Sequence, residues 1–258
     1  MSTTFIELGS VALSASMAVA AGLVGCFAVM RRMTLAADAV SHVALPGIGV
    51  ALLLHGSPIV GALVTLFLGT ILIWALEIRT KISTETVIGV VFTVALAIGS
   101  FLTPGEELID ALFGAPGKLT GWEVGFGLVG AAIVISLILA LKNALIVSLV
   151  SPDIASTSGI NVAMLNLIFL LAFALTVALG IRFLGVLLMG SLIIIPAVTA
   201  RRLATNLTAM LLLSVGVAVI STMVGISLGA LFQRETGPLI ASAAGGIFFL
   251  SLSRKQPA

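Results

Sequence analysis

Charged residues are scarce in this sequence. Only 9% of its 258 residues are Asp, Glu, Lys or Arg, 60% are hydrophobic, and the mean hydropathy is +1.32. Soluble domains normally contain about 25% charged residues, so this composition excludes a soluble globular protein. Many uncharged runs reach about 20 residues, the length of a helix that crosses a hydrocarbon core of roughly 30 Å. The sequence therefore predicts an all-α polytopic membrane protein.

Cysteine and histidine are nearly absent as well. Cys26 is the one cysteine, which excludes an intrachain disulfide and a cysteine-based metal cluster. The two histidines, His42 and His55, form no HExxH motif and leave little for a catalytic metal or a nucleophile, so we do not expect an enzyme. The opening stretch MSTTFIELGS lacks the basic region of a secretory signal peptide. We expect the first apolar segment to remain as a membrane helix.

Charge clusters and Gly/Pro positions divide the chain into apolar segments of membrane-spanning length. The predicted spans are 10–30, 34–54, 57–77, 86–103, 122–141, 163–181, 183–200, 206–232 and 237–253. About nine transmembrane helices are therefore expected, or eight if the region 163–200 is divided differently. We treat residues 1–258 as a single transmembrane domain.

Basic residues predict how the chain is oriented, because short cytoplasmic loops carry an excess of Lys and Arg. With the N-terminus outside and the C-terminus in the cytoplasm, nine basic residues lie inside: Arg31, Arg32, Arg79, Lys81, Lys142, Arg201, Arg202, Arg254 and Lys255. Three lie outside: Lys118, Arg182 and Arg234. The outer side then collects acids: Glu7, Glu106, Glu107, Asp110, Glu123 and Glu235. Such a surface suits a cationic solute or a basic docking partner, or it only solvates the loops.

The long external connection 104–123 contains apolar residues between acids, so a short amphipathic helix at the outer interface is expected there. Its GAPGK segment is not a phosphate-binding loop. The Walker pattern needs Gly at position 112 and Ser or Thr at 119, and both residues are Leu. We expect no nucleotide site in this chain, and no nucleic acid partner.

The cytoplasmic connection SPDIASTSGI (151–160) carries signals for a separate short helix. Ser151 is a good N-cap, Pro152 suits the first helical position, and Asp153 lies where the helix dipole favours an anion. Ala155 lies within this helix, and Gly159 is a natural residue to end it. A short capped helix at this place is either a rigid turn or a docking element for a soluble partner.

Asp38 and His42 are the unusual pair in the segment DAVSHVALPG (38–47). At a rise of 1.5 Å per residue, His42 lies about 15 Å beyond Arg32, and the i, i+4 spacing puts both side chains on one helical face. Their oxygen and nitrogen atoms suit Zn²⁺, Mn²⁺ or Fe²⁺. Pro46 and Gly47 are expected to break the helix just beyond, where freed carbonyls line a cavity.

Other interpretations of these two residues stay open. In the alternative for Asp38, its carboxylate pairs with Arg31 or Arg32 or caps a broken helix. In the alternative for His42, its imidazole makes a hydrogen bond between helices. His55 is expected at the outer interface. Two protein ligands do not close a four-coordinate site, whereas a homodimer with these helices facing its axis supplies two Asp and two His.

Four segments together resemble a known family. RRMTLAADAVSHVALPG (31–47), LFG (112–114), SPDIASTSGI and LGVLLMGSLIIIPAVTARRLA (184–204) are similar to the ZnuB-like permease subunits of ABC importers for zinc, manganese and iron. The similarity runs in order over nearly the whole chain. Ala37 replaces the Gly that commonly precedes the acid in this family.

The resemblance implies a type II, vitamin-B12-importer-like helical fold and a homodimer in a bacterial or archaeal cell membrane. It implies two copies of a separate ATPase, which hydrolyses ATP, and an extracytoplasmic metal-binding protein that delivers the ion. The short helix near 151–160 then becomes the coupling helix that docks into the ATPase, and Asp38 and His42 match positions that handle the metal. Pro196 lies in the family-like IIIPAV segment and is a candidate gating position beside Pro46 and Gly47.

Alternating access driven by the ATPase is the predicted mechanism, with zinc favoured over manganese or iron. A proton-coupled secondary carrier is one alternative, but DAVSHVALPG has no acid-and-His counterpart in the second half of the chain. A membrane scaffold that transports nothing is a second alternative, but it needs no polar pair at membrane depth, so Asp38 and His42 argue against it. A siderophore or cobalamin ABC permease is a further alternative, but its large ligand does not require a pair such as Asp38 and His42 in the translocation path.

Overall fold

The computed structural model of the chain describes residues 2–34, 36–80, 82–102, 121–184, 186–234 and 236–253. Within its helices, the side chains of residues 2–8, 37–38, 182–184 and 186–188 lie outside this description. The helices are α1 (Ser2–Met30), α2 (Ala36–His42), α3 (Leu45–Leu53), α4 (Pro58–Thr80), α5 (Thr84–Leu102), α7 (Gly121–Val150), α8 (Pro152–Thr157), α9 (Val162–Leu184), α10 (Val186–Leu203), α11 (Leu207–Phe232) and α12 (Thr236–Leu252). The described part of the chain contains no strand, as the long uncharged runs predicted.

The predicted spans agree closely with these helices. Each of the nine overlaps one helix, except the second, which is divided between α2 and α3, and α7 continues nine residues beyond its predicted end at 141. By length and composition, six described helices suffice to cross a membrane, namely α1, α4, α5, α7, α9 and α11. Two shorter apolar stretches, Ala39–Leu53 and Thr236–Leu252, accompany them. The chain is therefore a multi-span helical membrane protein, while the total of eight or nine spans stays a prediction.

Helix α1 lies at the centre of the larger group of helices and packs against α7, α10 and α11. Small residues permit close approach, because helices in lipid associate by packing rather than by the hydrophobic effect. A Cβ atom on Gly25 would lie 2.0 Å from the carbonyl oxygen of Ile193 in α10. Ser214 of α11 donates a hydrogen bond of 2.8 Å to the carbonyl oxygen of Gly22. Gly22 and Gly25 therefore serve the close packing of α1 on α10 and α11.

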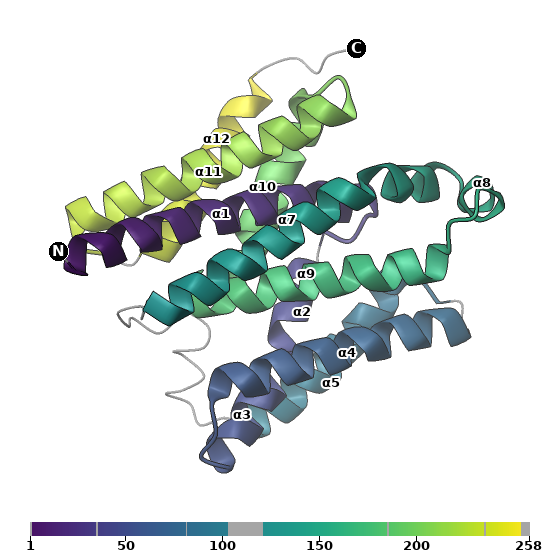
Figure 1. The fold of residues 1–258 in the computed structure, drawn as a ribbon, viewed down its shortest axis with the longest axis horizontal. Helices are drawn as coiled ribbons and strands as arrows, with labels where there is room; N and C mark the ends of the chain where they lie inside the picture. The colour runs from purple at the N-terminus through teal and green to yellow at the C-terminus, as the bar shows by residue number, and fades with distance from the viewer. Residues whose placement is uncertain are drawn as a thin grey trace.

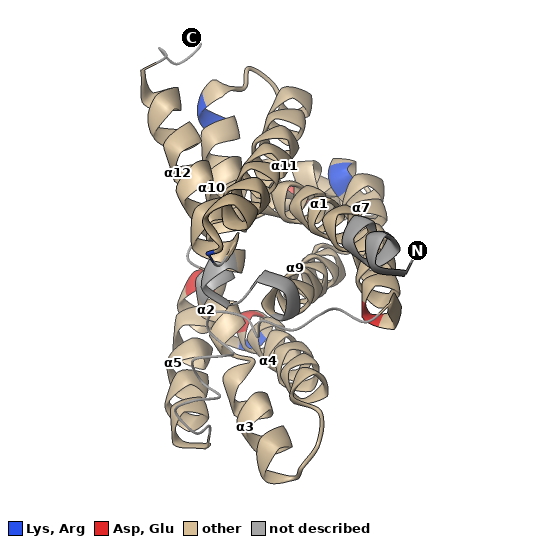
Figure 2. Cartoon of the chain, turned by 90° about the vertical axis from the view of Figure 1, so that its left-hand side faces the viewer, with Lys and Arg blue, Asp and Glu red and all other residues tan. Residues whose placement is uncertain are grey.

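The helices form two groups, joined by α2 and α9. Helices α10, α11 and α12 pack on one another, and α10 and α11 also pack on α1, whereas α3, α4 and α5 form the second group (Figure 1). Helix α9 contacts α4 on one side and α7 on the other, and α2 contacts α5, α9 and α10. Seen from the end, the helices are almost free of charged residues (Figure 2). The short helix α2 therefore lies where the two groups meet.

The C-terminal ends of α1, α4 and α7 lie toward the same side of the molecule as α8 (Figure 1). Arg31 and Arg32 follow α1 directly, and Arg79 lies in the last turn of α4. This placement agrees with the predicted clustering of basic residues on one side. The choice of that side as cytoplasmic stays a prediction.

Candidate functional site

The predicted metal-handling segment forms a short helix followed by a break. Asp38 and His42 both lie on α2, one helical turn apart, as the sequence spacing predicts. The ring of His42, which is half-buried, packs against the ring of Phe92 from α5, with 5.5 Å between the ring centroids. The side chain of Asp38 lies outside the described residues.

The break between α2 and α3 lies earlier than the sequence suggested. Helix α2 ends at His42, residues 43 and 44 form a turn, and Pro46 already belongs to the first turn of α3. Proline has no backbone N–H, and its ring would clash with the carbonyl of the residue four positions earlier, which is His42. The helix therefore ends before the proline, and the first turn of a new helix accepts it.

Gly47 has a packing role in the structure. It is buried within α3, and a Cβ atom on it would lie 2.1 Å from the carbonyl oxygen of Gly61 in α4. It brings α3 and α4 together rather than interrupting the helix. Pro196, the third candidate for a break, lies inside α10, which continues from Val186 to Leu203. The missing N–H of this proline removes one backbone hydrogen bond, and contacts with α1, α11 and α12 hold the helix.

The environment of α2 offers few additional ligands. Among the side chains that the structure describes, no group of three or more His, Cys, Asp or Glu residues is placed to hold a metal ion. His55, the second histidine, is exposed at the end of α3, where it adopts a left-handed backbone conformation with φ of 52°. Hydrogen bonds from His55 N to Leu52 O and from Gly56 N to Ala51 O close this helix end. His55 is therefore a helix-ending residue, separate from α2.

The short helix predicted in the loop 151–160 is present as α8. The Ser151 hydroxyl accepts a hydrogen bond from the backbone N–H of Ile154, and Pro152 is the first helical residue. Asp153 lies in the first turn. Gly159 has a φ of 81°, so its left-handed conformation ends the helix as predicted. Local signals alone were sufficient, because each of them acts within one or two turns.

Both ends of α8 are joined firmly to their neighbours. At its end, Gly159 N donates to Ser156 O and Ile160 N donates to Ala155 O, the paired bonds of a Schellman motif. Ala155 is fully buried, whereas the other residues of α8 are exposed. Helix α8 stands beyond the ends of α7 and α9 at one end of the molecule (Figure 1). This exposed and capped helix is available to a partner protein.

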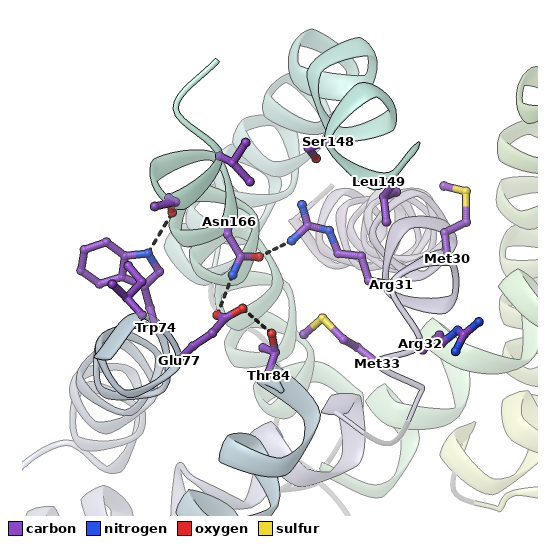
Figure 3. A pocket seen from close by; sticks show the side chains of 13 residues that line it. Met30, Arg31, Arg32, Met33, Trp74, Glu77, Thr84, Ser148, Leu149 and Asn166 are labelled. Carbon is purple, nitrogen blue, oxygen red and sulfur yellow. Dashed lines mark hydrogen bonds between the residues drawn. The ribbon is translucent and has the colours of Figure 1, made fainter. Parts of the chain in front are cut away.

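A polar cavity that the sequence analysis did not predict lies near the start of α9. It has a volume of about 520 Å³, and Figure 3 shows Arg31, Glu77, Thr84 and Asn166 meeting there from four different segments. Arg31 donates a hydrogen bond to Asn166 Oδ1, and Asn166 Nδ2 donates to Glu77 Oε2 over 2.7 Å. Thr84 donates to the other oxygen of Glu77 over 2.5 Å.

Arg31 is held by an aromatic ring as well. Its guanidinium carbon lies 4.5 Å from the ring centroid of Phe169, a cation–π contact. Burial lowers the pKa of Arg31 to about 10, and the charge of Glu77 opposes this change. Arg31 therefore stays protonated at neutral pH. The structure shows Arg31 bound to Asn166. The predicted pairing of Arg31 with Asp38 stays a prediction, because the Asp38 side chain lies outside the described residues.

Several predicted features cannot be compared with the structure. The amphipathic helix expected within 104–123 falls mostly outside the described residues, as do the acids at 106, 107 and 110. The same holds for Lys81, Lys118, Glu235, Arg254 and Lys255. The outer acidic surface therefore stays a prediction.

The described helices define a multi-span membrane protein, and comparisons with known proteins place it in a family. Residues 5–255 match the family described as the ABC 3 transport family. The chain belongs to this family of metal-ion ABC permeases, so it is a transport subunit rather than an enzyme, as predicted.

Individual relatives agree with this assignment. The chain is 31% identical to the high-affinity zinc uptake system membrane protein ZnuB of Haemophilus influenzae, with 90% of this chain and 91% of the relative covered. It is 30% identical to the manganese transport system membrane protein MntC of Halalkalibacterium halodurans, over 89% of this chain and 80% of the relative. A solved structure of PsaBC from Streptococcus pneumoniae in complex with Fab superposes with a TM-score of 0.81, at 25% identity, and covers 96% of this chain and 91% of that chain.

Proposed function

We propose that this chain is the transmembrane subunit of an ABC importer for divalent transition-metal ions, with zinc favoured and manganese or iron as the other candidate cargoes. Similarity to a zinc uptake permease and to a manganese transport permease supports this cargo class. Zinc is favoured because the segments SPDIA and IIPAVTARR are ZnuB-like. The similarity also supports a bacterial or archaeal cell membrane as the location.

The observation that carries the proposal is the placement of Asp38 and His42 on α2. This helix has seven residues and lies among α5, α9 and α10, where the two groups of helices meet. A carboxylate and an imidazole one turn apart supply ligands of the type that zinc, manganese and ferrous iron accept. A homodimer of the type II fold, with α2 of each protomer facing the axis, supplies four ligands to one ion.

The proposed mechanism is alternating access, with one partner protein on the outer side of the permease and another on its cytoplasmic side. A metal-binding protein docks on the outer side and releases the ion into the path, and a separate ATPase binds α8 in the cytoplasm. ATP binding and hydrolysis move α8 and change the side on which the path is open. The site at Asp38 and His42 binds weakly, because an ion that is held tightly does not leave.

Metal uptake in cells that contain the permease, its ATPase and its binding protein tests the proposal. Asp38→Asn and His42→Ala are compared with wild type at equal membrane levels, with Zn²⁺, Mn²⁺ and Fe²⁺ supplied separately. His55→Ala is the matched control, because this exposed histidine lies at the far end of α3. We expect both α2 variants to lose uptake of one ion while ATP hydrolysis persists, and the control to transport normally. Normal uptake by both α2 variants would refute the assignment of the site.

A further inference from the structure

The hydrogen bonds around Asn166 form a continuous connection between four segments of the chain. Asn166 accepts from Arg31 through its oxygen and donates to Glu77 through its nitrogen, so both ends of its amide are used. Glu77 in turn accepts from Thr84, the first residue of α5, through its second oxygen (Figure 3). The amide has one favourable orientation here, because reversing it would place its NH₂ group against the Arg31 donor.

Arg31 is firmly connected to α2. It follows the last residue of α1 and lies five residues before Ala36, where α2 begins. Arg32 takes a left-handed conformation with φ of 61°, and Arg32 N and Met33 N donate to Val29 O and Ala28 O. Ala36 N then donates to Met33 O. Hydrogen bonds thus tie residues 31–33 to α1 and Met33 to the first residue of α2, so we expect a displacement of Arg31 to displace the start of α2.

Asn166 is connected in the same way to α8. It lies in the second turn of α9, which begins at Val162, four residues after the C-cap of α8 at Ser158. The Schellman bonds at Gly159 and Ile160 end α8, and Asn161 caps α9 by accepting from Met164 N over 3.0 Å. Gly159, Ile160 and Asn161, the residues between the C-cap of α8 and the start of α9, each make a capping hydrogen bond, so we expect α8 and the first turns of α9 to move together.

We infer that Arg31, Asn166 and Glu77 are positioning residues that connect the docking helix α8 to the ion-handling helix α2. A displacement of α8 moves the start of α9, and Asn166 passes it to Arg31 and so to α2. Glu77 and Thr84 join the α4–α5 hairpin to the same motion, and α5 carries the Phe92 ring that packs on His42. The inference rests on the proposed function, since it takes α8 as the docking element and α2 as the metal site.

The test measures ATP hydrolysis and metal uptake together, in vesicles that contain the permease with its ATPase and receive the loaded binding protein. Asn166→Leu removes both hydrogen bonds, and Glu77→Gln keeps the shape of the side chain but removes the charge. Asn143→Leu and Glu85→Gln are the matched controls, because these substitutions make the same chemical changes at exposed residues outside the network. We expect the two network variants to assemble and hydrolyse ATP. The number of ions moved per ATP hydrolysed should fall about two- to thirtyfold, the fold-change to which measured coupling energies correspond.

A combined variant separates positioning from simple structural support. Arg31→Gln together with Glu77→Gln removes the two opposite charges of this network at once, so we expect it to assemble better than Arg31→Gln alone and to stay uncoupled. The inference is overturned if the network variants keep the wild-type ratio of ions moved to ATP hydrolysed. This includes the case in which uptake and hydrolysis fall in equal proportion. If Asn166→Leu does not assemble, Glu77→Gln decides by the same ratio. A wild-type complex that hydrolyses ATP and moves none of the three ions refutes the proposed function itself.

Discussion

Gly47 of α3 and Gly61 of α4 lie so close together that a Cβ atom on either would come within 2.1 Å of the carbonyl oxygen of the other. The contact is between two backbones, which cannot move aside as a flexible side chain can. It holds α3 against α4 directly after the turn that follows α2. Two residues without side chains therefore set how closely α3, the helix that follows α2 in the chain, packs on α4.

The first prediction concerns this contact. Gly47→Ala and Gly61→Ala each force α3 and α4 apart, so we expect a loss of stability of about 1–3 kcal/mol, the usual cost of overpacking. Thermal unfolding of the purified protein in detergent measures it. Gly89→Ala in α5 is the control, because a Cβ atom there has nothing within 4 Å. Equal unfolding temperatures for all three variants would contradict the packing argument.

A second prediction concerns the ends of α8. Ser151→Ala removes the N-cap bond to Ile154, at a cost of about 1 kcal/mol to the helix. Gly159→Ala places a side chain at a φ of 81° and costs about 1–2 kcal/mol. If α8 docks the ATPase, both variants weaken recovery of the ATPase with the permease from detergent-solubilised membranes. Ser158→Ala changes an exposed serine beside them and is expected to behave as wild type.

Arg202 leads to a third prediction, about the end of α12. Its side chain donates to the carbonyl oxygens of Ser251 and Leu252, over 3.3 and 3.2 Å. A cation at a helix C-terminus satisfies carbonyls that lack partners and interacts favourably with the dipole, which contributes about 0.3–1 kcal/mol. Arg202→Gln is expected to speed amide hydrogen exchange in the last turn of α12, while exchange in α11 stays unchanged. Unaltered exchange at residues 249–252 would show that these bonds do not hold the helix end.

Gln233 provides a fourth prediction. It ends α11 in the left-handed conformation, with φ of 50° and ψ of 44°. Glycine adopts this conformation without the cost of about 1–2 kcal/mol that other residues meet. We expect Gln233→Gly to unfold at a higher temperature than Gln233→Ala. The opposite order would mean that the side chain of Gln233 makes a contribution beyond its backbone conformation.

The sequence predicted those features whose causes are local. Helix α8 was placed correctly because Ser151, Pro152 and Gly159 each act within a few residues. The helix break after His42 was expected, but its position was displaced because the steric effect of Pro46 reaches back four residues. The apolar runs located the spans for the same reason: each helix in lipid must satisfy its own backbone.

The network around Asn166 was not predicted, and the reason is physical. Arg31 and Asn166 are 135 positions apart in the sequence, and Glu77 and Asn166 are 89 apart. An isolated Asn near the start of an apolar helix has no local signature, and Glu77 is one acid in the last turn of a span. Such contacts depend on how α1, α4 and α9 come together, which no short stretch of sequence records.

The shortness of α2 has a consequence for affinity. A helix of seven residues is too short to be stable in isolation, so its shape is imposed by α5, α9 and α10. An ion held on α2 is therefore bound by a geometry that three other helices set. If α2 holds the ion, substitutions in those three helices are expected to retune which metal is accepted and how long it stays. Selectivity would then be a property of the assembly of helices rather than of two side chains.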